Sequence, residues 1–209
     1  IRDVERSRGL GDVYKRQEYS MGKKPLNESQ VKTLRKLTSD SPLHSLLLNL
    51  SVDLMLRASD LLRLQVSDVM TESGVSKESV QVRQKKTGKT TLEIPLSPYS
   101  RKVIEEHLHN RNPNDFVFKG QKSHYTRKAI TTQQYQRIIK GWMRELGIED
   151  VSGYSSHSMR KTKASVLYKK TSNVEAVRRL LGHQSVTATS SYLGVEDEDA
   201  AELARKFSF

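Results

Sequence analysis

Apolar side chains recur at helical spacing along most of this chain, and the pattern changes to a period of two in one short segment. Helical spacing predicts amphipathic helices, because positions i, i+3, i+4 and i+7 share one helix face. Asn27 or Ser29 is suited to cap the first helix, and Pro42 stands at the start of a second, more apolar one. We therefore expect helices over about 27–37, 43–55, 59–64, 98–109, 131–146, 157–170 and 173–181, a short one near Tyr192, and a tail helix over 197–207.

The segment with a period of two predicts a β-hairpin. Val80 to Arg83 alternates, Thr87-Gly88 is typical of a turn, and Thr91 to Pro95 alternates again. Pro95 has no N–H to donate, so it should end the second strand or lie at an edge. The expected fold class is therefore α+β, mainly α, with one small antiparallel sheet.

A chain of 209 residues is long enough to form one domain with a real core. Residues 27–209 should form this domain, and residues 1–26 should be poorly ordered. The stretch from Asp12 to Gln17 can be back-translated to the mosaic-end adapter of a sequencing transposon. Residues 1–17 are therefore hypothesised to be a cloning or sequencing scar. Residues 110–130 hold few core-forming side chains and should be a long basic loop.

The charge balance favours a polyanionic partner. Lys and Arg number 36 against 24 acidic residues, which gives a formal net charge of +12. A solvated basic surface is the other interpretation. The absence of cysteine excludes disulfides, thiolate chemistry and Cys-type zinc sites. The sequence has no secretory signal and no apolar run near the roughly 20 residues that span a bilayer, so we expect a cytoplasmic protein.

Three polar clusters in the second half of the chain are candidates for chemistry. His157 and Arg160 lie three residues apart in a helix opened by one of the two preceding serines. Both side chains should project from one face near the positive end of that helix, which is a good phosphate site. Gly182 is suited to end a helix and to fix the following His183, and Tyr192 comes nine residues after that histidine. Each cluster alone also fits an ordinary structural role.

In combination these residues resemble the signature of the tyrosine recombinases, or phage-integrase type: H-x-x-R, then L-L-G-H, then a Tyr nine residues after that His. The resemblance runs from about residue 27 to 203 and implies the helical catalytic domain of that family. It also implies an earlier arginine, supplied by Arg57 in LRASDLL, and a lysine in the hairpin. Lys86 fills that place, with Lys85 and Lys89 as close rivals. Three positions depart from the residues common in the family. Met55 stands in place of a Gly, Ser158 in place of an Asp, and Lys161 in place of a His or Arg.

The resemblance implies DNA cleavage and rejoining through a covalent 3′-phosphotyrosine intermediate. The tyrosine would be the nucleophile, and the two arginines would hold the non-bridging phosphate oxygens through planar, always-charged guanidinium groups. Lys86 is the candidate general acid, and the two histidines would move protons or bond the phosphate. A phosphotyrosine link keeps the energy of the broken bond, so no ATP, metal or other cofactor should be needed. The expected catalytic residues are Arg57, Lys86, His157, Arg160, His183 and Tyr192.

Double-stranded DNA is the implied partner, and the basic loop around Tyr125 is suited to its phosphates. By resemblance the protein should form a homotetramer on DNA, with a monomer in solution as one option. The tail helix, acidic at its start and apolar at Ala200, Leu203 and Phe207, should then dock on a neighbouring protomer. Either a further N-terminal DNA-clamping domain is missing from this sequence, or the protein is a minimal form. The expected DNA contacts are Lys85, Lys89, Lys119, Lys122, Arg127, Lys128 and Lys161.

Two other functions stay open at this point. A type IB topoisomerase uses similar groups to relax supercoils without exchanging strands. A DNA-binding relative that has lost catalysis would form no covalent adduct. A metal site at His107 and His109 is disfavoured, because residues two apart on a helix do not face each other.

Overall fold

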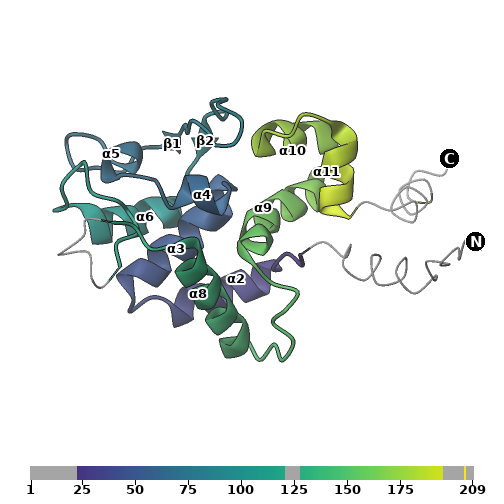
Figure 1. Ribbon diagram of the computed structural model, residues 1–209, viewed down its shortest axis with the longest axis horizontal. Coiled ribbons are helices and arrows are strands. Elements are labelled where there is room, and N and C mark those ends of the chain that lie inside the picture. Colours follow the sequence, from purple (N-terminus) through teal and green to yellow (C-terminus); the bar gives the residue numbers. More distant parts are fainter. Residues whose placement is uncertain (1–22, 121–127, 195–204, 206–209) are drawn as a thin grey trace, which may run out of the picture.

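The computed structural model describes residues 23–120, 128–194 and 205 as a mainly helical molecule with one small β-hairpin (Figure 1). This confirms the expected fold class. The elements are α2 (Glu28–Leu37), α3 (Pro42–Leu54), α4 (Ala58–Leu61), α5 (Val66–Val69), β1 (Ser79–Val80), β2 (Ile94–Pro95), α6 (Pro98–Leu108), α8 (Thr132–Glu145), α9 (Ser156–Thr171), α10 (Val174–Leu181) and α11 (Val186–Leu193).

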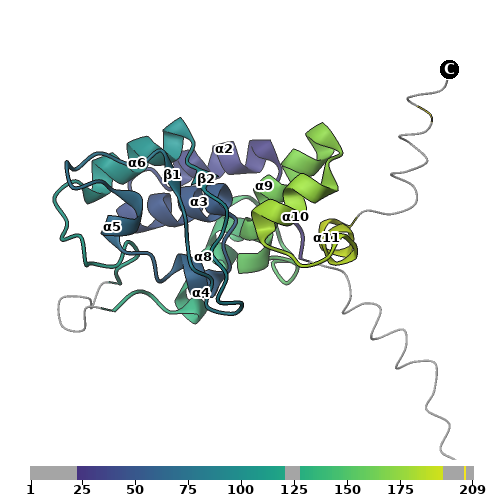
Figure 2. The ribbon, with the colours of Figure 1, turned by 90° about the horizontal axis from the view of Figure 1, so that it is seen from above.

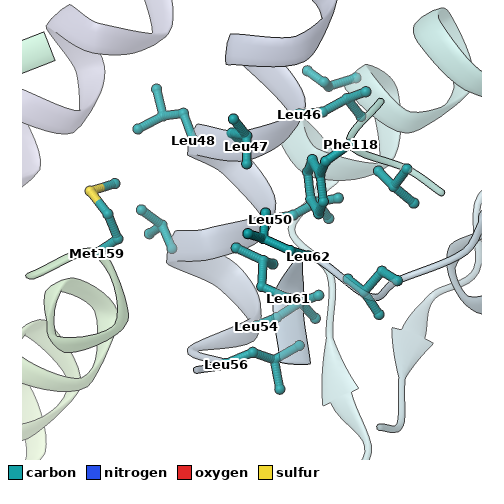
Figure 3. Packing of buried hydrophobic residues seen from close by; sticks show 14 of the residues in the cluster. Leu46, Leu47, Leu48, Leu50, Leu54, Leu56, Leu61, Leu62, Phe118 and Met159 are labelled. Atoms are coloured by element: carbon teal, nitrogen blue, oxygen red, sulfur yellow. The ribbon is translucent and has the colours of Figure 1, made fainter. Parts of the chain in front are cut away.

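Helix α3 is the centre of the core. Every residue from Ser45 to Leu54 is buried, and the helix packs against α6 and α9. Figure 3 shows leucines of α3 with Phe118 on one side and Met159 of α9 on the other. A second, smaller cluster of buried side chains joins the C-terminal end of α3 to α9 and α10, through Met55, Ala164, Val177 and Leu181. The last three helices are thus attached to the core through α3 and α9.

Local capping signals explain where most helices begin. The Asn27 side chain accepts from the Gln30 N–H in a capping box, and Ser41 with Pro42 opens α3. Helix α2 buries Val31 and Leu34 but leaves Leu37, in its last turn, 51% exposed. The helix expected over 59–64 is shorter, ending at Leu61, and α5 was not expected at all.

The hairpin forms, but its ladder is interrupted. Only Ser79–Val80 and Ile94–Pro95 pair as strands, and Arg83 pairs with Thr90 in an isolated bridge. Between them the Thr91 hydroxyl accepts from the Val82 N–H at 3.0 Å, so a side chain replaces a ladder bond there. The expected turn holds, since Gly88 has a φ of 65°. Pro95 ends β2 as predicted.

Two expectations about segment boundaries need correction. Residues 110–130 are not simply a loop, because Val117 and Phe118 are buried in the core and the Val117 N–H bonds the Leu64 carbonyl at 2.8 Å. The packed region also starts before residue 27, because Leu26 is buried and its N–H bonds the Thr162 hydroxyl at 3.1 Å. Residues 1–17 and nearly all of the expected tail helix over 197–207 lie outside the described residues. Within the described parts of the chain, no helix is long and apolar enough to cross a bilayer.

Candidate active site

The candidate residues come from four segments that meet at one edge of the core: the start of α4, the hairpin, the start of α9, and the α10–α11 pair. Figures 1 and 2 show α10 and α11 beside α9, with α4 and the hairpin facing them. Arg57 is the N-cap of α4, and its Nη1 donates to Gln84 Oε1 of the hairpin at 2.8 Å. The first arginine is therefore tied to the segment that carries Lys86.

Arg160 is the most buried of the candidate residues, with 3% of its surface exposed. Ser155 caps α9 and so places Arg160 in the first turns, as the sequence indicated. Its Nη1 donates to the Met55 carbonyl and its Nη2 to the Leu181 carbonyl, both at 2.6 Å. Met55 has a left-handed φ of 49°, a backbone conformation that favours glycine. This turn after α3 places the Met55 carbonyl within reach of the guanidinium.

His183 follows the left-handed C-cap Gly182 of α10, as expected. Its Nδ1 lies 3.2 Å from the hydroxyl of the buried Thr189. That hydroxyl donates its proton to the Ser185 carbonyl at 3.1 Å, so it accepts from His183. The imidazole proton is thereby assigned to Nδ1, which leaves Nε2 as an acceptor in the neutral ring. Burial, followed by the charges of Arg160 and Arg57, lowers the pKa of His183 to about 4.

Tyr192 of α11 lies in the same cluster. Its hydroxyl donates to the His157 carbonyl at 3.3 Å, and its ring packs edge-to-face with His183 at 5.2 Å between centroids. Burial raises the pKa of Tyr192 to about 12, against the opposing charges of Arg160 and Arg57. Burial also lowers the pKa of Arg160 to about 10, which leaves it charged at neutral pH.

His157, by contrast, presents an exposed side chain at the start of α9. Burial of part of the ring and the charges of Arg160 and Arg57 lower its pKa. The histidine therefore lies within the field of the same two guanidinium groups as the tyrosine.

The lysines divide into two groups. Lys85, Lys86 and Lys89 are all exposed on the hairpin, and among the described residues the Lys86 side chain has no hydrogen bond or ion pair. Lys161 differs from these three, because it is only 7% exposed and its Nζ lies 5.8 Å from the centroid of the Tyr192 ring. It lies among the buried residues of α9, so the contact with DNA predicted for it would be beside the candidate nucleophile.

The basic loop is described only at its two ends. Lys119 forms an ion pair with Asp115, and Lys128 is exposed. Lys122, Tyr125 and Arg127 lie outside the described residues.

Gln84 is the residue at this site that the sequence analysis missed. It is 3% exposed and bonds Arg57 directly. The hairpin alternation contained a signal for it, because Val80, Val82 and Gln84 fall on one face at a period of two. A polar residue that continues an apolar face in a strand requires an internal partner.

Comparison with known proteins agrees with this geometry. The model of the phage integrase family matches residues 24–199. The probable integrase/recombinase YoeC of Bacillus subtilis is 30% identical over 151 residues, covering 72% of this chain and 76% of that protein. The tyrosine recombinase XerD of Listeria innocua is 27% identical over 160 residues, covering 73% of this chain but 50% of that protein.

Solved structures show the same fold at lower identity. The XerA recombinase superposes with a TM-score of 0.69 at 21% identity, covering 87% of this chain and 64% of that one. The Tn1549 transposon integrase in complex with transposon right end DNA superposes with a TM-score of 0.67 at 18% identity, covering 100% of this chain and 73% of that one. The chain therefore belongs to the phage integrase family, that of the tyrosine recombinases.

Proposed function

We propose that this chain is the catalytic part of an enzyme that cuts and rejoins DNA at specific sites. The observation that carries the proposal is that Tyr192 lies in one cluster with His157 and His183, through a hydrogen bond to the His157 carbonyl and a ring contact with His183. The charges of Arg57 and Arg160 also act on its phenol, although burial prevails and raises its pKa to about 12. Two cations beside a phenol suit a phosphodiester, whose non-bridging oxygens gain negative charge in the transition state. The Xer recombinase bound to difH DNA and the Tn1549 integrase bound to its transposon end give further support.

In the proposed reaction the Tyr192 oxygen attacks the phosphorus as the bond to the 5′ oxygen breaks. The phenol proton leaves to a neighbouring base, for which the Nε2 acceptor of His183 is suited, and the 5′ oxygen takes a proton from Lys86. The product is a 3′-phosphotyrosine bond and a free 5′ hydroxyl. Attack by the 5′ hydroxyl of another strand reverses these steps and completes the exchange. Because bond energy is kept in the phosphotyrosine, the reaction needs no ATP or metal.

The arginines hold the phosphate in this scheme. Arg160 is oriented by the Met55 and Leu181 carbonyls, and a guanidinium has more N–H donors than these two bonds use. The remaining donors of Arg160 and Arg57 are available for the non-bridging oxygens. Lys85, Lys89 and Lys128 contact the flanking DNA backbone, as do Lys119, Lys122 and Arg127 of the basic loop. Double-stranded DNA is the proposed substrate, and copies assemble on it as a tetramer. The proposed compartment is the cytoplasm.

Capture of a covalent adduct tests the proposal. The protein is incubated with a pool of nicked suicide duplexes with a randomised core, and denaturant-resistant adducts are separated on a gel. Wild-type protein should form an adduct and Tyr192→Phe none. Arg57→Ala and Arg160→Ala should slow adduct formation by about 100- to 1,000-fold, the usual cost of removing a transition-state donor.

Tyr99→Phe is the matched control, because Tyr99 is an exposed tyrosine on α6 and its ring still stacks under Arg35 after the change. Absence of any adduct with wild-type protein would overturn the proposal in favour of a DNA-binding protein without catalysis. An adduct together with relaxation of any supercoiled plasmid, without site preference, would place the chain with the type IB topoisomerases instead.

A further inference from the structure

Gln84 occupies the junction of three segments that carry candidate catalytic residues. Its backbone closes the turn of the hairpin: the Gln84 N–H donates to the Lys89 carbonyl, and the Gly88 N–H donates to the Gln84 carbonyl, each at 2.9 Å. Its side chain is almost fully buried, with 3% of the residue exposed. A buried amide in this place needs internal partners.

The amide oxygen has two donors, and both are informative. Arg57 Nη1 donates to Gln84 Oε1 at 2.8 Å, and the Thr87 hydroxyl donates to the same oxygen at 2.9 Å. A guanidinium can only donate, so the oxygen of the amide must face Arg57. One carbonyl oxygen thereby links the first arginine to the turn that includes Lys86.

The amide nitrogen lies against the third segment. A Cβ at Gly182 would stand 2.8 Å from Gln84 Nε2, closer than such contacts allow, and Gly182 also has a φ of 66°. Glycine is thus favoured at position 182 both by the backbone conformation and by the close approach of the Gln84 amide. The residue after it is His183, so the packing of Gln84 against Gly182 sets how closely the His183 turn approaches Arg57.

Asp60 adds a second tie between the same elements. Its Oδ1 accepts from the Lys85 N–H at 2.9 Å, and the residue is 2% exposed. The hairpin turn is therefore fixed to α4 at two consecutive residues, Gln84 and Lys85. Among the described residues, the Arg57 side chain has Gln84 as its hydrogen-bond partner, whereas Arg160 has two backbone carbonyls.

We propose that Gln84 is a positioning residue that holds the Arg57 guanidinium in place for the scissile phosphate and aligns it with the turns of Lys86 and His183. The proposal rests on the proposed function, because it concerns how well Arg57 stabilises the phosphate. Gln84 acts through Arg57 and does not itself react.

The test compares Gln84→Met with Gln81→Met. Methionine keeps the length of glutamine but removes the strong acceptor. Gln81 is a matched control, since it is an exposed glutamine on the same hairpin whose Nε2 bonds the Thr91 carbonyl. Gln84→Met should slow adduct formation about 10- to 100-fold, as expected for losing a hydrogen bond to a charged group, while Gln81→Met should match the wild type.

A methylphosphonate duplex separates positioning of Arg57 from general damage. Replacing one non-bridging oxygen by a methyl group removes the negative charge that Arg57 would stabilise. On one of the two methylphosphonate diastereomers, Gln84→Met should form the adduct less than about threefold more slowly than wild-type protein. The rate difference between Arg57→Ala and the wild type should shrink in parallel. Gly182→Ala, whose Cβ displaces the amide without removing the acceptor, should show the same pattern. The proposal would be overturned if Gln84→Met slowed adduct formation equally on the ordinary duplex and on both methylphosphonate duplexes. It would also be overturned if Gln84→Met reacted with the ordinary duplex as fast as the wild type.

A measurement without DNA keeps this proposal apart from the proposed function. In the NMR spectrum, the Arg57 guanidinium group should rotate slowly about its Nε–Cζ bond in wild-type protein and in Gln81→Met. The same rotation should be fast in Gln84→Met. If wild-type protein forms no adduct but its Arg57 guanidinium rotates slowly, the catalytic function would be wrong, while the contact of Gln84 with Arg57 would still be established. Fast rotation in the wild type would overturn the positioning role.

Discussion

Arg160 illustrates how one side chain can satisfy two helix ends. The carbonyls that it bonds belong to Met55, the C-cap of α3, and to Leu181, the last residue of α10. Carbonyls at a helix C-terminus have no partner within the helix and carry partial negative charge, so a buried cation is well placed there. The same contacts that balance the buried charge of Arg160 also fix its orientation. At this residue, stability and the proposed catalysis depend on the same two bonds.

Met55→Gly tests which contributes more to stability at this turn, the strain of the Met55 backbone or the packing of its side chain. Glycine would relieve a left-handed conformation that costs about 1–2 kcal/mol for other residues. The Met55 side chain, however, is 1% exposed and packs with Ala164, Val177 and Leu181. Truncating a buried methionine costs about 2–5 kcal/mol, so the loss of packing should prevail. We expect the free energy of unfolding in urea to fall by about 2 kcal/mol, and an unchanged or higher value would contradict this balance.

At the scale of elements, Asp53 joins three helices. This buried residue of α3 accepts from the Ser97 N–H at 2.9 Å and the Ser100 hydroxyl at 2.5 Å, and pairs with Lys163 of α9 at 3.3 Å. Burial pushes the pKa of Asp53 upward, but the charge of Lys163 and the hydrogen bonds from Ser100 and Ser97 outweigh it and lower the pKa. The orientation of α9, and with it of Arg160, therefore depends on an ionised Asp53.

Asp53→Asn should change how stability depends on pH. Because the folded pKa of Asp53 is below the unfolded value of about 3.9, the unfolded state binds more protons as the pH falls. The contribution of Asp53 is then complete above about pH 4 and is lost as the pH falls through the folded pKa. Urea unfolding between neutral and acid pH should show a lower free energy of unfolding for Asp53→Asn, by about 3 kcal/mol at neutral pH, with the gap narrowing in acid. A constant gap would contradict the role of the charge, and Asp40→Asn, at an exposed position, is the control.

Helix boundaries set by residues close together in the sequence could be predicted from it. Contacts between segments far apart in the sequence could not. The caps at Asn27 and Ser41 are local, and they place the starts of α2 and α3 correctly. The break in the hairpin depends on one hydroxyl, that of Thr91, which competes for a backbone N–H. Phe118 is buried directly after residues 115–117, which pair with residues 64–66 far away in the sequence.

The candidate site shows the same division. The order and spacing of its motifs identified which residues to consider, and the family match supports that reading. The two carbonyls that hold Arg160 lie 105 and 21 residues away in the sequence, and no spacing rule names them. Gln84 likewise acquires its importance from a contact with Arg57, 27 residues earlier. Motifs therefore predict the reacting groups, whereas the groups that orient them follow from tertiary contacts.

At the scale of the whole molecule, one protomer contains both the candidate nucleophile and the cations around it. Tyr192 bonds the His157 carbonyl of its own chain, and its pKa responds to Arg160 and Arg57 of that chain. Under the proposed function, each copy can therefore cut one strand with its own tyrosine. Two duplexes contain four strands, so an exchange requires four copies, and they must be joined by contacts outside the active site.

The tail is the proposed source of those contacts. Its apolar residues Leu203 and Phe207 would contribute about 3–6 kcal/mol if buried on a neighbour, enough to strengthen assembly at least 100-fold. Deleting residues 197–209 should thus leave the adduct with a suicide duplex intact but weaken the tetramer on DNA by about 100-fold or more, measured by mass photometry. Leu203→Asp should act like the deletion, and Glu202→Gln should not. A deletion variant that assembles as the wild type does would show that the tail packs on its own domain, so that other surfaces must join the four copies.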